Sequence, residues 1–120
     1  MDRIVIAGSS AGAMISLSAE WEICKGNGPK GFRAAGVMSF AGAIMSDSGT
    51  PSYPSEPCPQ LLIHGTADNF VPVAMSRAIY ARNPSMITFV EVNGAPHGLS
   101  YFQDHELYCR AFCDFLARTA

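Results

Sequence analysis

Short apolar runs alternate with segments of helical periodicity along this chain of 120 residues. Four such runs, at residues 3–7, 34–40, 60–64 and 86–92, predict strands, because strands of a buried parallel sheet carry apolar side chains on both faces. Helices are predicted from the end of the first run to about residue 24, at 73–82 and at about 101–117. This alternation predicts an α/β fold, a parallel sheet with crossover helices, built from about four strands and three helices.

The helix predictions rest on spacing and on residues that begin or end helices. Apolar residues at three- and four-residue steps mark the buried faces of the first and last helices. These residues are Met14, Leu17, Trp21 and Cys24 in the first helix, and Phe102, Cys109, Phe112 and Leu116 in the last. Pro72 suits the first turn of the middle helix, and Asn83-Pro84 ends that helix. Residues 42–59 are rich in Ser, Gly and Pro, so they predict a loop that is too short for a large cap.

Charge and composition narrow the class of protein. A net charge of −2 without clusters of Lys or Arg gives no support for binding nucleic acid or an anionic membrane. No apolar stretch reaches the ~18 residues of a membrane span. The apolar start is interrupted by Gly8, Ser9 and Ser10, so it makes no convincing signal peptide, and localisation stays open. Length and an apolar content of 48% indicate one globular domain at most.

Four cysteines leave the redox compartment open. Cys109 and Cys113 are four residues apart on a predicted helix and share a face, but a metal site would need two more ligands. The simplest interpretation is that the cysteines are small buried apolar residues. A disulfide between Cys24 and Cys58 stays an alternative for an exported protein.

The segment Gly8-Ser9-Ser10-Ala11-Gly12 directly follows the first predicted strand. The pattern G-x-S-x-G at a strand-to-helix turn is typical of a nucleophile elbow, whose serine sits in a strained backbone conformation. Glycine on both sides is expected because strand and helix approach closely there. The pattern therefore predicts Ser10 as a catalytic nucleophile. The alternative is an ordinary helix-capping serine, a role that Ser9 could fill equally well.

Two further segments place an acid and a histidine after later strands. Asp68 lies in Gly65–Pro72, which follows the third predicted strand, and His97 lies in Asn93–Gly98, which follows the fourth. Because the carboxyl ends of parallel strands share one edge of a sheet, we expect both residues to lie on the same rim as Ser10. A serine hydroxyl needs a base to take its proton, and a carboxylate that orients the imidazole completes such a site.

The phrase LLIHGTADNFVP at 61–72 resembles the acid-bearing turn of α/β-hydrolases, a superfamily of esterases, lipases and prolyl-oligopeptidase-like peptidases, and GAPHGL at 94–99 resembles their histidine loop. The order serine, acid, histidine is also theirs. The resemblance implies a triad of Ser10, Asp68 and His97, no metal or organic cofactor, and the Ala11 N–H as an oxyanion donor. It further implies that residues 1–120 are a single partial domain, the C-terminal half of an α/β-hydrolase fold that starts at the elbow strand. The second oxyanion donor would then come from the other half.

The expected function is that of a serine hydrolase that cleaves small-molecule carboxylic esters through an acyl-enzyme on Ser10. A prolyl-oligopeptidase-like serine peptidase shares the HGTAD turn and stays an alternative. A third hypothesis is a catalytically inactive half-domain, because residues 3–7 would be a central strand of the complete fold and would here have an unpaired edge. Such an edge predicts self-association or pairing with an N-terminal half.

Other roles stay open for the candidate residues. Asp68 could bond only to its own turn, and Asp47 is a rival acid in the preceding loop. His97 could be a loop histidine, His64 is expected to hydrogen-bond locally, and His105 is expected at the surface. A metal site of His64, Asp68 and His97 would lack a fourth ligand, and the elbow segment lacks the spacing of known phosphate-binding loops.

Overall fold

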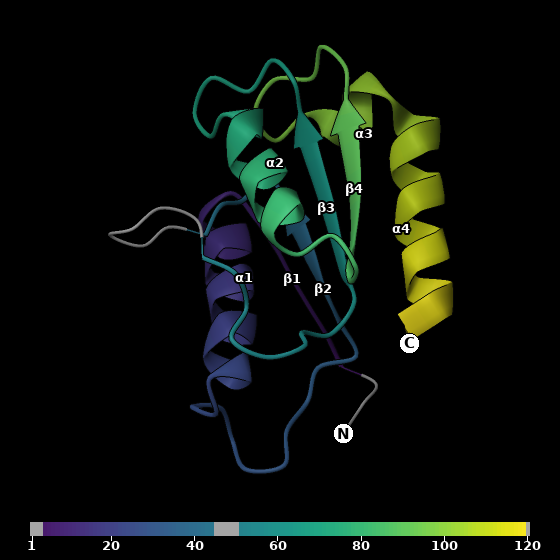
Figure 1. Cartoon of the computed structure of the whole chain (residues 1–120). Coiled ribbons are helices and arrows are strands. Elements are labelled where there is room, and N and C mark those ends of the chain that lie inside the picture. Colours follow the sequence, from purple (N-terminus) through teal and green to yellow (C-terminus); the bar gives the residue numbers. More distant parts are fainter. Residues whose placement is uncertain (1–3, 45–50, 120) are drawn as a thin grey trace.

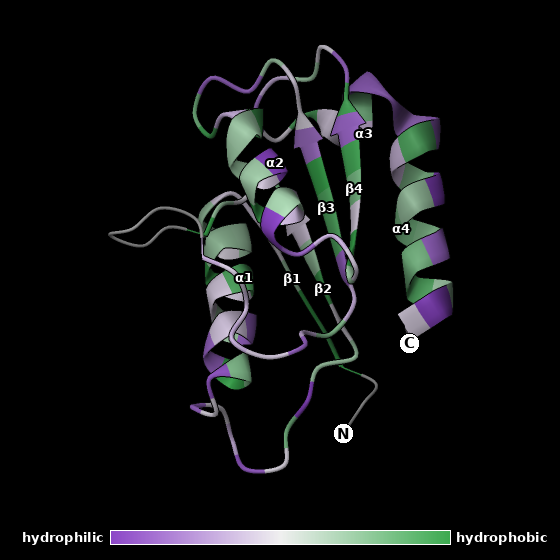
Figure 2. Cartoon of the chain, in the orientation of Figure 1, coloured by the Kyte–Doolittle hydropathy of each residue, from purple (hydrophilic) through white to green (hydrophobic). Residues whose placement is uncertain are grey.

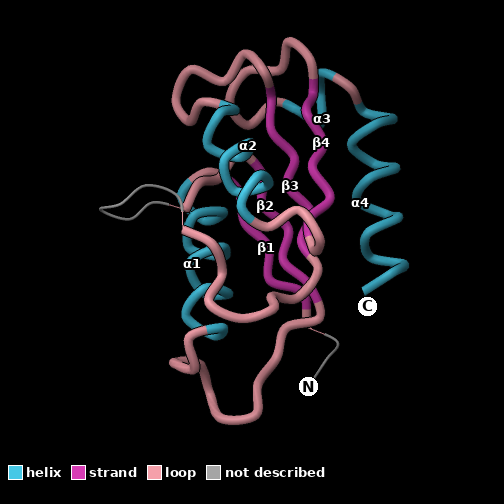
Figure 3. The backbone as a smooth tube through the Cα atoms, in the orientation of Figure 1, coloured by secondary structure: helices cyan, strands magenta, loops and turns pink. Residues whose placement is uncertain are grey.

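A computed structural model describes residues 4–44 and 51–119 of the chain. The elements in these ranges are β1 (Val5–Ser9), α1 (Ala11–Cys24), β2 (Gly36–Phe40), β3 (Gln60–Gly65), α2 (Val73–Arg82), β4 (Ile87–Val92), α3 (Ser100–Gln103) and α4 (His105–Thr119). Figure 3 shows how these helices and strands alternate along the backbone. The four predicted strands and the first two predicted helices are confirmed, with small shifts at their ends.

The strands form one parallel sheet in the order β1-β2-β3-β4. Each connection must therefore bring the chain back to the same end of the sheet before the next strand begins. Helices α1 and α2 cover one face of the sheet, and α4 covers the other (Figure 1). This arrangement confirms the predicted α/β fold with crossover helices.

Strand β3 is buried along its whole length and lies between two apolar clusters. On one face its Leu62 belongs to a cluster with Leu17 of α1 and Ile79 of α2. On the opposite face Ile63 belongs to a cluster with Phe115 of α4. Burying one such side chain fully contributes about 1.5–3 kcal/mol, so these two clusters hold the helices on the sheet. Figure 2 shows hydrophobic residues along the strands and both hydrophobic and hydrophilic residues along α4.

The last predicted helix is wrong as a single element, because the chain leaves helical geometry at Asp104 (φ −145°, ψ 81°). Its Oδ1 atom accepts a hydrogen bond from the Leu107 N–H at 3.1 Å, which caps the start of α4. The predicted buried face is also partly wrong. Phe102 is 77% exposed, whereas Phe115, which lies off that face, is 0% exposed and Phe112 packs beside it. The prediction continued one helical periodicity through residue 104, so it assigned the wrong residues of α4 to the buried face.

All four cysteines lie in the described ranges and are free thiols, so the alternative of a Cys24–Cys58 disulfide is wrong for this structure. The buried Glu20 carboxylate accepts a hydrogen bond from the Cys58 N–H at 2.8 Å and lies 3.6 Å from the Cys24 sulfur. Burial, together with the Glu20 charge, raises the pKa of both thiols, so they are protonated at neutral pH. Cys113 is exposed, which corrects its interpretation as a buried apolar residue.

None of the described helices is long and apolar enough to cross a membrane.

Candidate active site

Ser10 is the single residue that joins the end of β1 to the start of α1. Its backbone has φ 56° and ψ −116°, a conformation that residues other than glycine rarely adopt. The Ser10 N–H donates to the Phe40 carbonyl at 2.9 Å, and the Ser10 carbonyl accepts from the Met14 N–H at 3.1 Å. Hydrogen bonds on both sides hold the strained turn, so its hydroxyl is presented at the carboxyl end of the sheet.

The two glycines of the elbow differ in how tightly they are packed. A Cβ atom at Gly8 would lie 2.2 Å from the Gly12 carbonyl oxygen and 2.8 Å from the Ala13 nitrogen, so no side chain fits there. A Cβ atom at Gly12 would meet no described atom within 4 Å. The expectation that both glycines are required is therefore wrong for Gly12, because the close approach is made by its carbonyl group and not by its Cα.

Asp68 follows β3 in a turn, and both of its carboxylate oxygens are used. Oδ1 accepts hydrogen bonds from the Phe70 N–H at 2.9 Å and the Val71 N–H at 2.8 Å. Oδ2 lies 2.7 Å from Nδ1 of His97. Asp68 thus bonds to its own turn and contacts the histidine, so these two roles are not alternatives. Burial raises the pKa of the Asp68 carboxyl, but the hydrogen bonds from His97, Val71 and Phe70 lower it more, and the pKa lies below the usual aspartate value.

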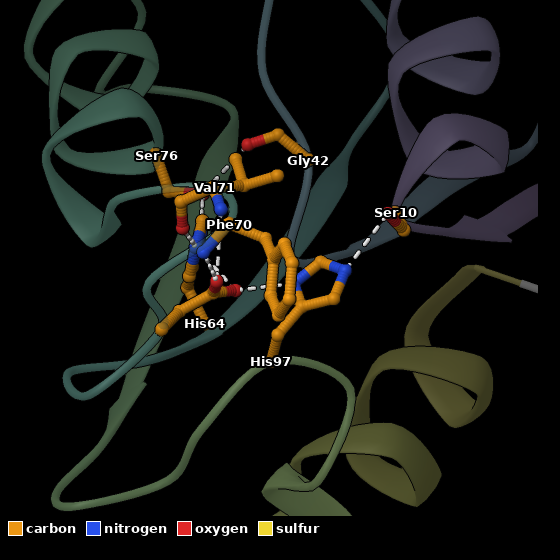
Figure 4. A network of polar contacts seen from close by, with 8 residues as sticks. Ser10, Gly42, His64, Phe70, Val71, Ser76 and His97 are labelled. Carbon is orange, nitrogen blue, oxygen red and sulfur yellow. Dashed lines mark hydrogen bonds and ion pairs between the residues drawn. The ribbon is translucent and has the colours of Figure 1, made fainter.

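His97 lies in the loop after β4 and connects the other two residues. Its Nδ1 atom is 2.7 Å from Oδ2 of Asp68, and its Nε2 atom is 2.9 Å from Oγ of Ser10 (Figure 4). An ionised carboxylate can only accept, so Nδ1 carries the proton and the neutral ring offers Nε2 as an acceptor for the serine hydroxyl. Residues from the ends of three strands therefore meet in one hydrogen-bonded line of hydroxyl, imidazole and carboxylate, the geometry of a serine, histidine and aspartate triad.

The histidine loop is held against the acid turn by a close backbone approach at Gly65. A Cβ atom there would lie 2.1 Å from the Ala95 carbonyl oxygen, which also accepts a hydrogen bond from the Ala67 N–H at 3.1 Å. The Thr66 hydroxyl accepts from the Gly94 N–H at 2.8 Å. These contacts tie the segment that carries Asp68 to the segment that carries His97, and they explain the glycine of the HGTAD turn.

Ala11 is the first residue of α1, and the first N–H groups of a helix have no acceptor within the helix. The first turn of α1 contains no acidic residue, so the partial positive charge of this helix end is not neutralised there. Ala11 itself is exposed beside Ser10. The Ala11 N–H, at the exposed start of α1, is therefore placed to bind an oxygen atom that carries negative charge, and its catalytic role stays a prediction.

Aromatic side chains surround the site. The Phe70 ring, 82% exposed, lies tilted against the His97 ring with 5.4 Å between the ring centres. A cavity of about 90 Å³ beside the elbow is lined by Ser9, Tyr101 and Tyr108, among other residues. A wider hollow of about 530 Å³, lined in part by Arg33, lies at the opposite, amino ends of the strands, away from this chemistry. The cavity beside the elbow is thus lined by both apolar and hydroxyl-bearing side chains.

His64 is a residue of the site that the sequence reasoning left without a chemical role. It is fully buried behind the acid turn, and both of its ring nitrogens are hydrogen-bonded. The sequence feature that could have indicated its importance is its position directly before Gly65 in the HGTAD turn. His105 is exposed on α4 beside Tyr101, as predicted, and Asp47 lies outside the described residues.

Metal coordination finds no support in the residues that the structure describes, since no group of three or more His, Cys, Asp or Glu there could hold an ion. The rings of His64 and His97 each use both nitrogens in hydrogen bonds within the protein. The interpretation of His64, Asp68 and His97 as metal ligands is therefore not supported.

A family model described as phospholipase/carboxylesterase matches residues 1–103. Among solved structures, esterase PE8 is 20% identical over 97% of this chain and 50% of its own, with a TM-score of 0.68. A variant of SOBER1 from Arabidopsis thaliana is 21% identical over 98% of this chain and 54% of its own, with a TM-score of 0.70. A predicted CIB-like hydrolase from Thermoplasma acidophilum is 22% identical over 96% of this chain and 51% of its own, with a TM-score of 0.68. The chain thus shares their fold and spans about half of their length.

Proposed function

The chain belongs to the phospholipase/carboxylesterase family of α/β-hydrolases, and we propose that it carries the nucleophile, base and acid of a serine hydrolase that cleaves carboxylic esters. The observation that carries this proposal is the line from Ser10 Oγ through the His97 ring to Asp68, with distances of 2.9 and 2.7 Å. The strained backbone of Ser10 further supports the proposal, because residues in such strained conformations are found mainly at functional sites.

In the proposed reaction, Ser10 Oγ attacks the ester carbonyl carbon while Nε2 of His97 takes the hydroxyl proton. The ionised Asp68 stabilises the imidazolium that forms. His97 then gives this proton to the leaving alcohol as the carbon–oxygen bond of the ester breaks, which leaves an acyl group on Ser10. A water molecule then attacks the acyl carbon while His97 takes one of its protons. His97 returns this proton to Ser10 Oγ as the bond between Oγ and the acyl carbon breaks, which releases the acid and restores the serine.

Negative charge develops on the carbonyl oxygen in both steps. The Ala11 N–H at the start of α1 is the proposed donor to this oxygen, and the helix end adds a favourable partial charge. One such donor contributes roughly 3–4 kcal/mol to transition-state stabilisation in a working enzyme. The proposal assigns no second donor within the described ranges.

The uncharged cavity beside the elbow supports small or medium acyl or aryl esters as substrates. Phe70 packs against the His97 ring, Tyr101 lines the cavity beside the elbow, and none of the described residues that line this cavity is charged. Aromatic side chains contribute to binding by burying large apolar areas. The phospholipase/carboxylesterase match favours esters over the peptides cleaved by prolyl-oligopeptidase-like enzymes.

The test is labelling of the chain by a fluorophosphonate, a probe that phosphonylates activated serines. We expect the unmodified chain to label, Ser10→Ala and His97→Ala to lose the label, and the matched Ser9→Ala variant to retain it. Loss of the label in Ser9→Ala together with its retention in Ser10→Ala would show that Ser9, and not Ser10, is the nucleophile. Absence of label in the unmodified, folded chain would contradict the proposal that these residues alone form an active site.

A second candidate function is association without catalysis, and the position of β1 favours it. This strand pairs with β2 on one side and lies at the edge of the sheet that the structure describes. The strand carries no charged side chain, and Ile4 before it is 41% exposed. Uncharged edges of this kind invite pairing with another strand, from a second copy or from an N-terminal half.

Light scattering over a range of protein concentrations tests this association. We expect the mean mass to rise with concentration if β1 pairs, and Ala7→Lys to suppress the rise, because a lysine on an edge strand opposes pairing. Ala7 is exposed, so the lysine can reach water. A monomer at every concentration would refute association through β1.

A further inference from the structure

His64 lies at the centre of a polar network behind the candidate triad. It belongs to β3 and is fully buried. Its Nδ1 atom is 2.6 Å from the Ser76 hydroxyl of α2, and its Nε2 atom is 2.6 Å from the Val71 carbonyl oxygen (Figure 4). The same Nε2 atom lies 3.4 Å from Oδ2 of Asp68. One side chain thus contacts α2, the acid turn and the acid itself.

The hydrogen-bond partners determine which nitrogen of the neutral ring carries the proton. A carbonyl oxygen can only accept, so the contact with Val71 requires a proton on Nε2. Nδ1 of the neutral ring then has a lone pair and accepts the proton of the Ser76 hydroxyl. The Ser76 oxygen also lies 3.5 Å from the Gly42 carbonyl, which is too long to compete with a contact of 2.6 Å. The Val71 carbonyl therefore selects the Nε2–H form of His64, and Ser76 donates to the other ring nitrogen.

The acid turn is held at its start by the histidine loop and at its end by Asp68 and His64. Residues 66–72 belong to no helix or strand, and Phe70 points its ring to solvent and to His97 rather than into the core. The Val71 N–H donates to Oδ1 of Asp68, while the Val71 carbonyl is bound by His64. The peptide groups on both sides of Val71 are consequently held, one by the acid and one by His64. Moving the Val71 carbonyl would move the N–H groups that orient the carboxylate.

We propose that His64 is a positioning residue: its Nε2–H, bound by the Val71 carbonyl, holds the turn at Val71 so that Oδ2 of Asp68 meets Nδ1 of His97. This inference rests on the proposed function, since it concerns the efficiency of the same site. His64 touches no substrate in this scheme and acts through Asp68. A displacement of about 1 Å in such a site can lower a rate by about 10²-fold, so the support has a measurable effect.

Two substitutions at this position separate the two ring nitrogens. The side-chain amide nitrogen of His64→Gln can reach the place of Nε2 and donate to the Val71 carbonyl. The shorter His64→Asn can accept from Ser76 near the place of Nδ1 but cannot reach Val71. We expect His64→Gln to label with fluorophosphonate within a few-fold of the unmodified rate, and His64→Asn to label at least tenfold more slowly.

Nuclear magnetic resonance of the full chain supplies a readout that needs no turnover. Long-range proton–nitrogen spectra of the histidine rings should show His64 with a proton on Nε2 and none on Nδ1. The Nδ1–H of His97 should give a low-field signal from its hydrogen bond to Asp68. This signal should persist in His64→Gln and in Ser10→Ala, and should be lost or broadened in His64→Asn.

The proposal is overturned if His64 of the unmodified chain carries its proton on Nδ1, or if a folded His64→Asn retains both the His97 signal and the unmodified labelling rate. Loss of the His97 signal in a folded His64→Gln would overturn it as well. If circular dichroism shows that His64→Asn does not fold, the tautomer of the unmodified chain and His64→Gln still decide. Failure of the proposed function would appear separately, as an unlabelled chain whose His64 and His97 signals are as expected.

Discussion

Replacement of Gly8 by alanine tests whether the elbow depends on the contact between β1 and the start of α1. The new Cβ atom would lie 2.2 Å from the Gly12 carbonyl oxygen and 2.3 Å from its carbon. Ordinary van der Waals contact begins at 3.4 Å, so strand and helix would have to separate by at least about 1 Å. All the atoms in the contact belong to the backbone, so no flexible side chain can turn away.

The cost follows from what holds the helix in place. Ala13 and Leu17 of α1 are both 0% exposed, so α1 cannot move from the sheet without opening the core. Overpacking a core in this way typically costs about 1–3 kcal/mol, occasionally more, and we expect about 3 kcal/mol of unfolding free energy to be lost here. The shift would also move Ser10, which lies between the two elements, so fluorophosphonate labelling should fall by about 10²-fold.

Gly12→Ala is the matched control, because it adds the same methyl group four residues away. Its Cβ would meet no described atom within 4 Å, and replacing glycine by alanine in a helix is stabilising by up to about 1 kcal/mol. Urea unfolding can be followed by the fluorescence of Trp21, the single tryptophan of the chain. Equal stability of Gly8→Ala and the unmodified chain, or an equal loss in Gly12→Ala, would refute this reasoning.

Three further outcomes are expected. Asp68→Asn should lower the rate of fluorophosphonate labelling by about 10³-fold or more, since an amide can stabilise the wrong histidine tautomer; a rate within tenfold of the unmodified chain would contradict the role of the acid. The lowered pKa of Asp68 contributes stability above the unfolded value of about 3.9, and that contribution is lost as the pH falls through the folded value. The urea midpoint should therefore fall when the pH is lowered below about 4, and it should fall less in Asp68→Asn. The same pH dependence in both proteins would contradict a stabilising contribution from ionised Asp68. Phe115→Ala should lose about 3–5 kcal/mol of unfolding free energy, while Phe102→Ala should change it by less than about 0.5 kcal/mol, and equal effects would contradict the burial of α4.

Much of the candidate site was accessible from local sequence patterns. The motif around Ser10 and the acid and histidine turns each follow an apolar run, and parallel strands place such turns on one edge. The structure brings Ser10 and His97 to 2.9 Å although they are 87 residues apart in the chain. Their catalytic roles stay predictions until labelling is measured.

Other features were beyond the reach of these patterns. The break at Asp104 depends on a side chain that caps α4, and it changes which residues of that helix face the sheet. Gly8 and Gly12 look equivalent in the motif, yet only the former faces a neighbouring backbone. A histidine occurs in loops, in cores and in functional sites alike. The hydrogen bonds of His64 to Val71 and Ser76 could therefore not be predicted from its neighbours in the chain.

The sequence was enough to predict the order of strands and helices along the chain and the edge of the sheet at which Ser10, Asp68 and His97 lie. It could do so because hydrophobic periodicity and turn-forming residues act over a few neighbouring positions. The folded chain was needed to establish the distances among Ser10, Asp68 and His97, the burial of Phe115 and the contacts of His64. These depend on how distant segments pack against one another, and such packing is set by the shape of the whole core rather than by any local pattern.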